Sequence, residues 1–168
     1  MTAEQIIKFF RMQPLRKEGG YYVETYRCAE RIKKESLPER YPGDRNLGSV
    51  ILYLLTSKSI SLLHRLKSDE MFHFYFGQPV TMLQLYPDGK SEIITLGHKI
   101  LEEQKVQVVV PAGIWQGAFV QPGGKFALLG CSVAPAFEEE DFEIGNRNDL
   151  LSKYPDLREM ILKLTRGQ

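Results

Sequence analysis

The sequence predicts an all-β fold, a sandwich or barrel of short strands with a short helix near each end. Segments rich in Val, Ile, Tyr and Phe recur through the middle of the chain, with turn signals and no helical periodicity between them. The triplets 87–89 (PDG) and 122–124 (PGG) are strong turn sequences. The predicted strands are 21–28, 49–55, 61–66, 71–76, 80–86, 91–96, 105–110, 117–121 and 125–133.

Two helices frame these strands. Thr2 and Gln5 have the spacing of a capping box, and the apolar face that follows them stops before Pro14. A second helix is predicted from Pro155, which suits a first helical position, and a weaker helical turn over 149–152. Apolar residues at the three-and-four spacing of a buried stripe mark this second helix: Leu157, Met160, Ile161 and Leu164.

Several predicted strands are apolar on both faces, notably 50–55 and 108–110. A strand with one solvated face should alternate apolar and polar residues. Burial of both faces indicates that one face lines the barrel while a helix or another subunit covers the other. We therefore expect a homodimer. The alternative is a flat monomeric sandwich covered by its own terminal helices.

The chain reads as one domain over residues 1–168, because it has no internal repeat and no linker long enough to divide it. Hydrophobic residues make up 43% and charged residues 26%, a globular balance that argues against disorder. The formal charge of +1 favours neither a nucleic-acid partner nor an anionic membrane surface. Residues 29–48 are the least regular stretch and are predicted to be a surface loop, of a length often seen in functional lids.

The N-terminal region lacks the pattern of a signal peptide, because Glu4, Lys8 and Arg11 interrupt any apolar run. No apolar stretch approaches the roughly 18 residues that a membrane-spanning helix needs. In a chain without secretory features, Cys28 and Cys131 are expected to be free thiols. These observations together predict a cytoplasmic protein that does not bind membranes.

The residues with catalytic potential follow a spacing that begins at His64. Three residues separate Leu66 from Glu70, and six separate Glu70 from Gly77. This is the spacing of the first cupin motif, His-x-His, three or four residues, Glu, six residues, Gly, with Leu66 in place of the second His. Residues 111–116 (PAGIWQ) match the second motif, Pro-x-Gly-x-x-His, with Gln116 in place of the His.

This spacing is physically reasonable for a metal or catalytic site. Alternate side chains of a strand share one face, so such residues can converge inside a small barrel. His64, Glu70 and Gln116 would then be the candidate ligands of a weakly bound divalent metal such as zinc or manganese. Taken singly, each residue has a structural explanation: a satisfied core histidine, a surface carboxylate after a turn, and an amide that ends a strand.

Four ordered segments resemble a family of small single-domain cupins, long catalogued as a domain of unknown function. They are 18–27 (EGGYYVETYR), 68–77 (SDEMFHFYFG), 110–116 (VPAGIWQ) and 130–135 (GCSVAP), and the resemblance spans roughly residues 5–145. The resemblance implies a double-stranded β-helix, a dimeric jelly-roll barrel with an open, aromatic-lined cavity. It also implies that Leu66 and Gln116 are features of the family. The cupin fold does not by itself define a function.

The pocket is predicted to combine an aromatic wall with a few polar groups, which suits a sugar or a nucleotide base. The alternative is that the three phenylalanines merely fill the barrel. With His64 and Glu70, the expected lining residues are Phe72, His73, Phe74, Gln84, Tyr86, Trp115, Gln116 and Phe119.

The first functional hypothesis is a carbohydrate isomerase or epimerase, acting on a sugar phosphate or nucleotide sugar and similar to phosphomannose isomerase. His64 would be the base, Glu70 its orienting partner or an acid, and Tyr86 a second acid. His73 could complete a metal site only if its strand does not alternate simply.

The second hypothesis is a non-catalytic protein that binds a sugar-like or nucleotide-like metabolite. An iron-dependent dioxygenase is disfavoured, because such sites normally use two His and a carboxylate. The glycines of 18–20 (EGG) precede a strand and not a helix, so they indicate a tight turn and not a phosphate-binding loop.

Overall fold

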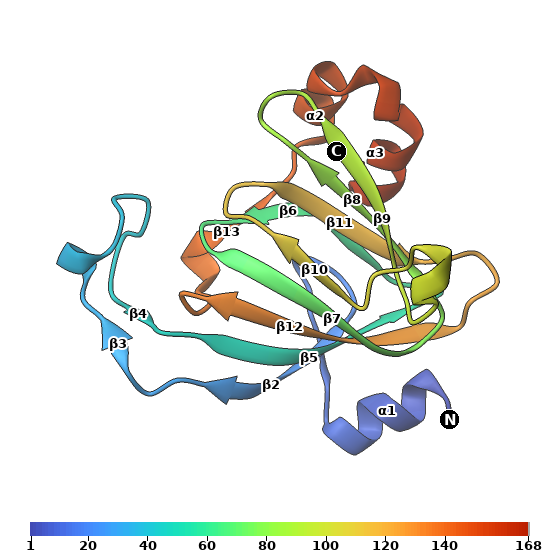
Figure 1. The fold of residues 1–168 in the computed structure, drawn as a ribbon, viewed down its shortest axis with the longest axis horizontal. Coiled ribbons are helices and arrows are strands. Elements are labelled where there is room, and N and C mark those ends of the chain that lie inside the picture. The colour runs from blue at the N-terminus through green and yellow to red at the C-terminus, as the bar shows by residue number, and fades with distance from the viewer. Residues whose placement is uncertain (168) are drawn as a thin grey trace.

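The computed structural model describes residues 1–167, in which strands predominate and short helices lie near both ends (Figure 1). The helices are α1 (Ala3–Phe10), α2 (Arg147–Lys153) and α3 (Arg158–Leu164), with 3-10 turns η1 (Lys34–Ser36), η2 (Ile100–Glu102), η3 (Glu139–Asp141) and η4 (Pro155–Leu157). The strands are β1 (Gln13–Pro14), β2 (Tyr21–Arg27), β3 (Arg31–Ile32), β4 (Arg45–Asn46), β5 (Ser49–Thr56), β6 (Ile60–Leu66), β7 (Asp69–Gly77), β8 (Val80–Leu85), β9 (Ser91–Leu96), β10 (Gln107–Val110), β11 (Trp115–Val120), β12 (Phe126–Ala134) and β13 (Phe142–Ile144).

Within residues 1–167, two main antiparallel sheets form a jelly-roll barrel (Figure 1). The larger sheet has the order β1-β2-β5-β12-β7-β10, and the smaller has the order β13-β6-β11-β8-β9. Strands that follow one another in sequence, such as β5 and β6 or β11 and β12, lie in different sheets. This alternation confirms the predicted all-β jelly-roll fold.

The predicted strands are all present, with small differences at their ends. The sequence missed β1, β3, β4 and β13, because strands of two or three residues show no recognisable period. The stretch 29–48 is more ordered than a plain loop, since it contains η1 and the paired strands β3 and β4. The weak turn expected over 149–152 lies inside helix α2.

Helix α1 begins as predicted. The Thr2 side chain accepts a hydrogen bond from the backbone N–H of Gln5 at 3.3 Å, and the Thr2 N–H donates to Oε1 of Gln5 at 2.9 Å. These reciprocal bonds satisfy two of the backbone donors that a helix start leaves free.

One face of α1 covers the outer face of the larger sheet. Ile6 packs there with Leu54, Phe126 and Leu128, all buried. Strand β5 is therefore buried on both faces, as its sequence predicted. No helix within residues 1–167 covers the outer face of β10, where Val109 is 51% exposed, so a second subunit remains the predicted cover at this edge of the sheet.

Helices α2 and α3 cover the outer face of the smaller sheet (Figure 1). Their buried residues are Leu150, Tyr154, Ile161 and Leu164, which pack with Leu63, Leu83, Leu85 and Phe119 of the sheet. None of the helices in residues 1–167 has both the length and the apolar character needed to cross a bilayer.

The interior of the barrel is packed at one end and hollow at the other. Along β12, the inward side chains of Ala127 and Leu129 belong to the main core cluster between the sheets. Farther along the same strand, Cys131 and Val133 line a cavity. The cavity therefore lies at the end of the barrel where the inward-facing side chains of several strands do not fill the interior.

The docking of α3 should contribute measurably to stability. We expect Ile161→Ala to lower the free energy of unfolding by about 2–5 kcal/mol, because Ile161 is 0% exposed and its loss leaves a cavity. The neighbouring Leu162→Ala should cost about 1 kcal/mol or less, since Leu162 is 37% exposed. Urea unfolding followed by circular dichroism measures both, and equal losses would contradict this account of the helix.

Candidate functional site

The cavity has a volume of about 510 Å³ and opens at one end of the barrel. It lies between the inner face of the larger sheet, strand β6, and the chain that follows β12. We call residues 137–142 the wall segment, because several of its side chains line the cavity. The apolar side chains that line the cavity include Tyr22, Ile51, Leu66, Val133, Phe137 and Phe142.

His64 lies on β6 and is 1% exposed. Its Nδ1 is 2.7 Å from the carbonyl oxygen of Leu62, which can only accept, so Nδ1 carries the proton of the neutral ring. The ring also stacks on Phe142 of the wall segment, with centroids 5.0 Å apart and planes at 24°. The orientation of His64 is therefore fixed, with Nε2 as the acceptor.

Gln116 joins His64 to Glu70. Gln116 on β11 is directly opposite His64 on β6, and its Nε2 lies 2.7 Å from Nε2 of His64. The same amide nitrogen donates to Oε2 of Glu70 at 3.0 Å. Both amide hydrogens are thus used, and the three residues of the two sequence motifs meet as predicted.

Glu70 is held in an environment that disfavours its charge. Burial, together with the nearby Glu18 carboxylate, raises the pKa of Glu70 from 4.5 to about 8. Hydrogen bonds with Cys131 and Gln116 offset part of this effect. At neutral pH Glu70 is therefore a carboxylic acid that can donate a proton. The pKa of the Cys131 thiol is also raised well above its usual value, first by burial and then by Glu70 and Glu18.

The polar floor of the cavity consists of Glu18, His64 and Glu70. Glu18 was not among the predicted site residues. Its Oε1 accepts a hydrogen bond from Ser61 at 2.6 Å, and its Oε2 lies 3.6 Å from Nε2 of His64. The latter distance is too long for a hydrogen bond. Sequence alone could not identify Glu18, because its approach to His64 requires closure of the barrel.

The turn that carries Glu18 requires glycine. Gly19 has φ +114°, and a Cβ atom there would lie 2.0 Å from the carbonyl oxygen of Ile60. Gly20 also has a positive φ, and the Gly19 carbonyl accepts a hydrogen bond from the Tyr53 hydroxyl at 2.8 Å. The expected tight turn is confirmed, and it directs Glu18 into the cavity.

The aromatic residues predicted to line the cavity do not line it; Tyr22, Phe137 and Phe142 do. Phe72 and Phe74 point into the barrel but belong to the packed core. Trp115 and Phe119 pack on the opposite side of β11, toward the C-terminal helices. Because Gln116 faces inward, strand alternation turns Trp115 outward, where the Arg65 guanidinium lies 4.5 Å from its ring.

The remaining predicted residues also lie away from the cavity. Gln84 donates to the Val109 carbonyl at 3.3 Å and accepts from the Tyr86 hydroxyl at 2.9 Å. Tyr86 additionally contacts Glu92, so its hydroxyl is engaged outside the cavity. His73 bonds Ser132 at 3.2 Å on the outer face of the larger sheet, because it is three residues from the inward-facing Glu70.

The proposed metal ligands do not fit a metal in their present arrangement. The Gln116 amide nitrogen, a donor, lies between the acceptor atoms of His64 and Glu70 and occupies the lone pairs that a metal would need. Leu66 lines the cavity in place of a second imidazole. Among residues 1–167, no cluster of three His, Cys, Asp or Glu side chains has metal-binding geometry.

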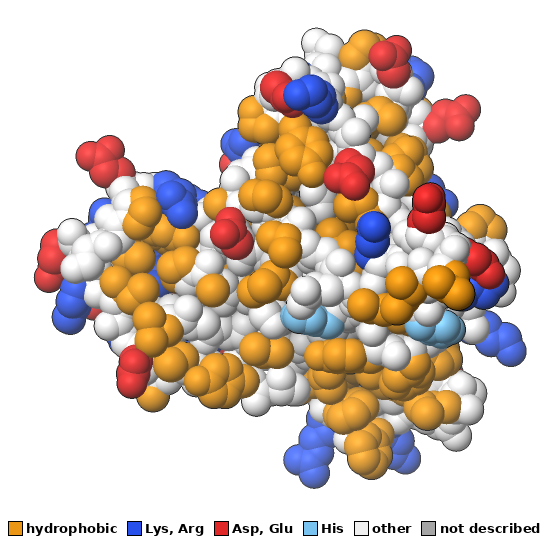
Figure 2. All heavy atoms as spheres, viewed as in Figure 1, with side chains coloured by type: hydrophobic (Ala, Val, Ile, Leu, Met, Phe, Trp, Pro, Cys, Tyr) orange, Lys and Arg blue, Asp and Glu red, His pale blue; other side chains and the backbone are white. Residues whose placement is uncertain are grey.

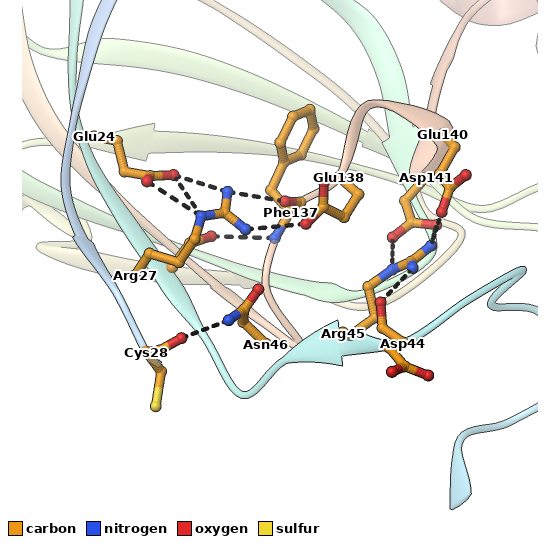
Figure 3. A network of polar contacts seen from close by, with 11 residues as sticks. Glu24, Arg27, Cys28, Asp44, Arg45, Asn46, Phe137, Glu138, Glu140 and Asp141 are labelled. Carbon is orange, nitrogen blue, oxygen red and sulfur yellow. Dashed lines mark hydrogen bonds and ion pairs between the residues drawn. The ribbon is translucent and has the colours of Figure 1, made fainter. Parts of the chain in front are cut away.

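Charged contacts fix the wall segment to the rest of the barrel (Figure 3). Arg45 on β4 is 1% exposed and forms two hydrogen bonds with Asp141, at 2.7 and 2.8 Å. Arg27 on β2 contacts Glu138 at 3.1 Å and the Phe137 carbonyl at 3.1 Å. The hydrogen bonds that these guanidinium groups donate to carboxylates raise the pKa of both arginines. Strand β4, within 29–48, therefore anchors the cavity wall.

The raised pKa of Glu70 predicts how stability depends on pH. The unfolded carboxyl ionises near pH 4.5 and the folded one near pH 8. Between these values the folded state binds more protons than the unfolded state, so stability should fall as pH rises and then level off above about pH 8.

The Glu70→Gln variant should lose this part of the pH dependence, because an amide keeps an acceptor for Gln116 but does not ionise. Thermal melting of both proteins across this pH range provides the measurement. A variant whose melting temperature falls as steeply as that of the wild type would contradict the assignment.

Comparison with known proteins agrees with the cupin-like fold. Residues 4–145 match the sequence family described as cupin superfamily (DUF985). A crystal structure of a protein from Shewanella oneidensis is 33% identical, covers 100% of this chain and 99% of its own, and superposes with a TM-score of 0.87. A hypothetical protein from Leishmania major is 28% identical, with coverage of 99% and 100% and a TM-score of 0.88.

More distant similarity concerns the fold alone. A Bacillus subtilis oxalate decarboxylase variant superposes with a TM-score of 0.53 at 16% identity, covering 90% of this chain and 37% of its own. Mn(II) centres are described for that enzyme. No curated protein sequence is significantly similar to this chain. The family match and the Shewanella relative lead to one conclusion: the chain belongs to the cupin superfamily, in the family designated DUF985.

Proposed function

We propose that the cavity binds a small polar metabolite and catalyses proton transfer on it, as a carbohydrate isomerase or epimerase. The observation that carries this proposal is the pairing of an acid and a base at the cavity floor. Glu70 is protonated at neutral pH, while Nε2 of His64 is an acceptor. Two titratable groups with different protonation states in one cavity are typical of acid–base catalysis.

In this mechanism Nε2 of His64 accepts a proton from the carbon next to a substrate carbonyl. Glu70 donates its proton to the carbonyl oxygen, which gives an enediol, an imidazolium and a carboxylate. The imidazolium then returns its proton to the former carbonyl carbon, while the Glu70 carboxylate takes the proton of the other enediol hydroxyl, whose oxygen becomes the new carbonyl; both side chains are thereby restored. For this step the substrate C–H must take the place of the Gln116 amide at His64, because that amide now occupies Nε2.

Carbon-bound hydrogen exchange tests the proposal directly. Hexose 6-phosphates, amino hexoses and nucleotide sugars would be incubated with the protein in D₂O, and NMR would follow deuterium uptake beside the carbonyl. His64→Ala and Glu70→Gln should each slow exchange by about 10²–10⁴-fold. Glu39→Gln, which removes an exposed carboxylate outside the cavity, is the control and should not change the rate.

The absence of exchange on all three classes, or exchange that survives both substitutions, would refute the catalytic proposal. Binding without exchange would support the second candidate, a non-catalytic metabolite-binding protein. The observation in its favour is that the Gln116 amide already satisfies both His64 and Glu70.

We also propose that the protein forms a homodimer through the outer face of the larger sheet. Side chains exposed or partly exposed there include Met71, His73, Tyr75 and Val109. Hydrophobic side chains gather on this side of the molecule (Figure 2). Apart from Asp69 at the start of β7, the outward positions of β7 and β10 carry no Lys, Arg, Asp or Glu, so a second copy can pack on the same surface with little like-charge repulsion.

The dimer prediction concerns mass in solution. Light scattering should report about twice 19.3 kDa, and Val109→Lys should shift the protein toward the monomer by placing a charge on this surface. Leu101→Lys is the matched control, because Leu101 is fully exposed on η2. A wild-type protein of one chain mass, or equal behaviour of the two variants, would contradict the proposed interface.

A further inference from the structure

The charges that line the cavity are unequal. Among the described lining residues, Arg16, Lys17 and Arg27 carry positive charge, whereas five glutamates line the same space. Two of these basic side chains are engaged with rim carboxylates. Lys17 contacts Glu139 at 2.6 Å, and Arg27 contacts Glu24 at 2.8 Å and also Glu138. The charge of the rim is thus largely neutralised by its own ion pairs.

The two glutamates at the floor differ from those at the rim. Glu18 accepts from the Ser61 hydroxyl and Glu70 accepts from the Gln116 amide, and both lie near His64. In residues 1–167 neither glutamate forms an ion pair with Lys or Arg. Buried carboxylates are normally paired with a cation. With Glu70 protonated at neutral pH, Glu18 leaves the floor with one negative charge that no Lys or Arg of the described residues balances.

An unsatisfied acceptor lies in the same cluster. Gln116 is 1% exposed, and its side-chain oxygen has no hydrogen-bond partner among the described residues. The amide nitrogen of Gln116 contacts His64 and Glu70, so the unpaired oxygen lies next to two residues that line the cavity. A buried acceptor without a donor is costly and calls for an explanation. The cluster is therefore short of donors as well as of positive charge.

We propose that the ligand of the cavity carries an amino group, protonated as an ammonium, which forms an ion pair with Glu18 and a hydrogen bond to a carboxyl oxygen of Glu70. An ammonium supplies both missing features, because it carries three N–H donors and one positive charge. Tyr22, Phe137 and Phe142 in the cavity wall add aromatic surface that favours a cation. A phosphate at the floor would instead face the Glu18 carboxylate.

This inference rests on the proposed function only in that the cavity takes a small polar metabolite. It narrows the substrate class to amine-bearing metabolites, such as amino sugars, over phosphorylated ones. A binding experiment can therefore separate it from the catalytic proposal, since binding is measured without turnover.

A matched hexose series tests the charge preference. Glucosamine, glucose and glucose 6-phosphate share one ring and differ in charge, and isothermal titration calorimetry or ligand-observed NMR would measure their dissociation constants. Glucosamine should bind about tenfold or more tightly than glucose, the effect expected of a charge-assisted hydrogen bond. Glucose 6-phosphate should bind no more tightly than glucose.

Variants locate the effect at the floor. Glu18→Gln should remove the preference for glucosamine, whereas Glu39→Gln, with the same change in charge but outside the cavity, should retain it. Glu18→Asp, which keeps the charge but withdraws it from the floor by one methylene, should weaken the preference and keeps the test decisive if Glu18→Gln does not fold.

Each outcome decides between the two proposals. If glucose or glucose 6-phosphate binds as tightly as glucosamine, the amine inference is wrong while metabolite binding stands. If glucosamine is preferred and Glu18→Gln leaves that preference intact, the assigned floor site is wrong. If no hexose of the series binds, metabolite binding in its sugar form fails, and the amine inference fails with it.

Discussion

The alternation of side chains along strands that close into a barrel is the constraint on which the site depends. His64, Glu70 and Gln116 come from three strands of two sheets, and each faces inward because of its parity along its own strand. The same rule turns Trp115 and His73 outward. A shift of one residue in register would exchange these sets and remove the site.

Burial then gives these side chains their chemistry. In water a carboxyl group such as that of Glu70 would be ionised at neutral pH, but burial, with Glu18 nearby, keeps it protonated. The Gln116 amide connects Glu70 with His64, whose neutral tautomer is fixed by a backbone carbonyl. The chain thus uses an amide where many cupin motifs have a third imidazole. In this arrangement the amide nitrogen occupies the acceptor atoms of His64 and Glu70 that a metal would need.

The wall segment shows how distant parts of the chain support the cavity. Arg45 lies 96 residues before Asp141, and the buried pair joins the ribbon of β3 and β4 to the segment that carries Phe137 and Phe142. A guanidinium with two bonds to one carboxylate fixes orientation as well as distance. The irregular stretch 29–48 therefore acts on the site as a support, and it contributes no residue to the cavity lining.

The sequence by itself determined the elements whose signals are local: the capping box of Thr2, the strand periods and the motif spacing from His64 to Gln116. It also indicated the Gly19–Gly20 turn. Only the tertiary structure decided that Glu18 approaches His64, that Arg45 holds Asp141, and that Phe72 fills the core while Phe142 lines the cavity. The physical reason is that these contacts join residues far apart in the chain, and they arise only when the barrel closes and its packing leaves one end hollow.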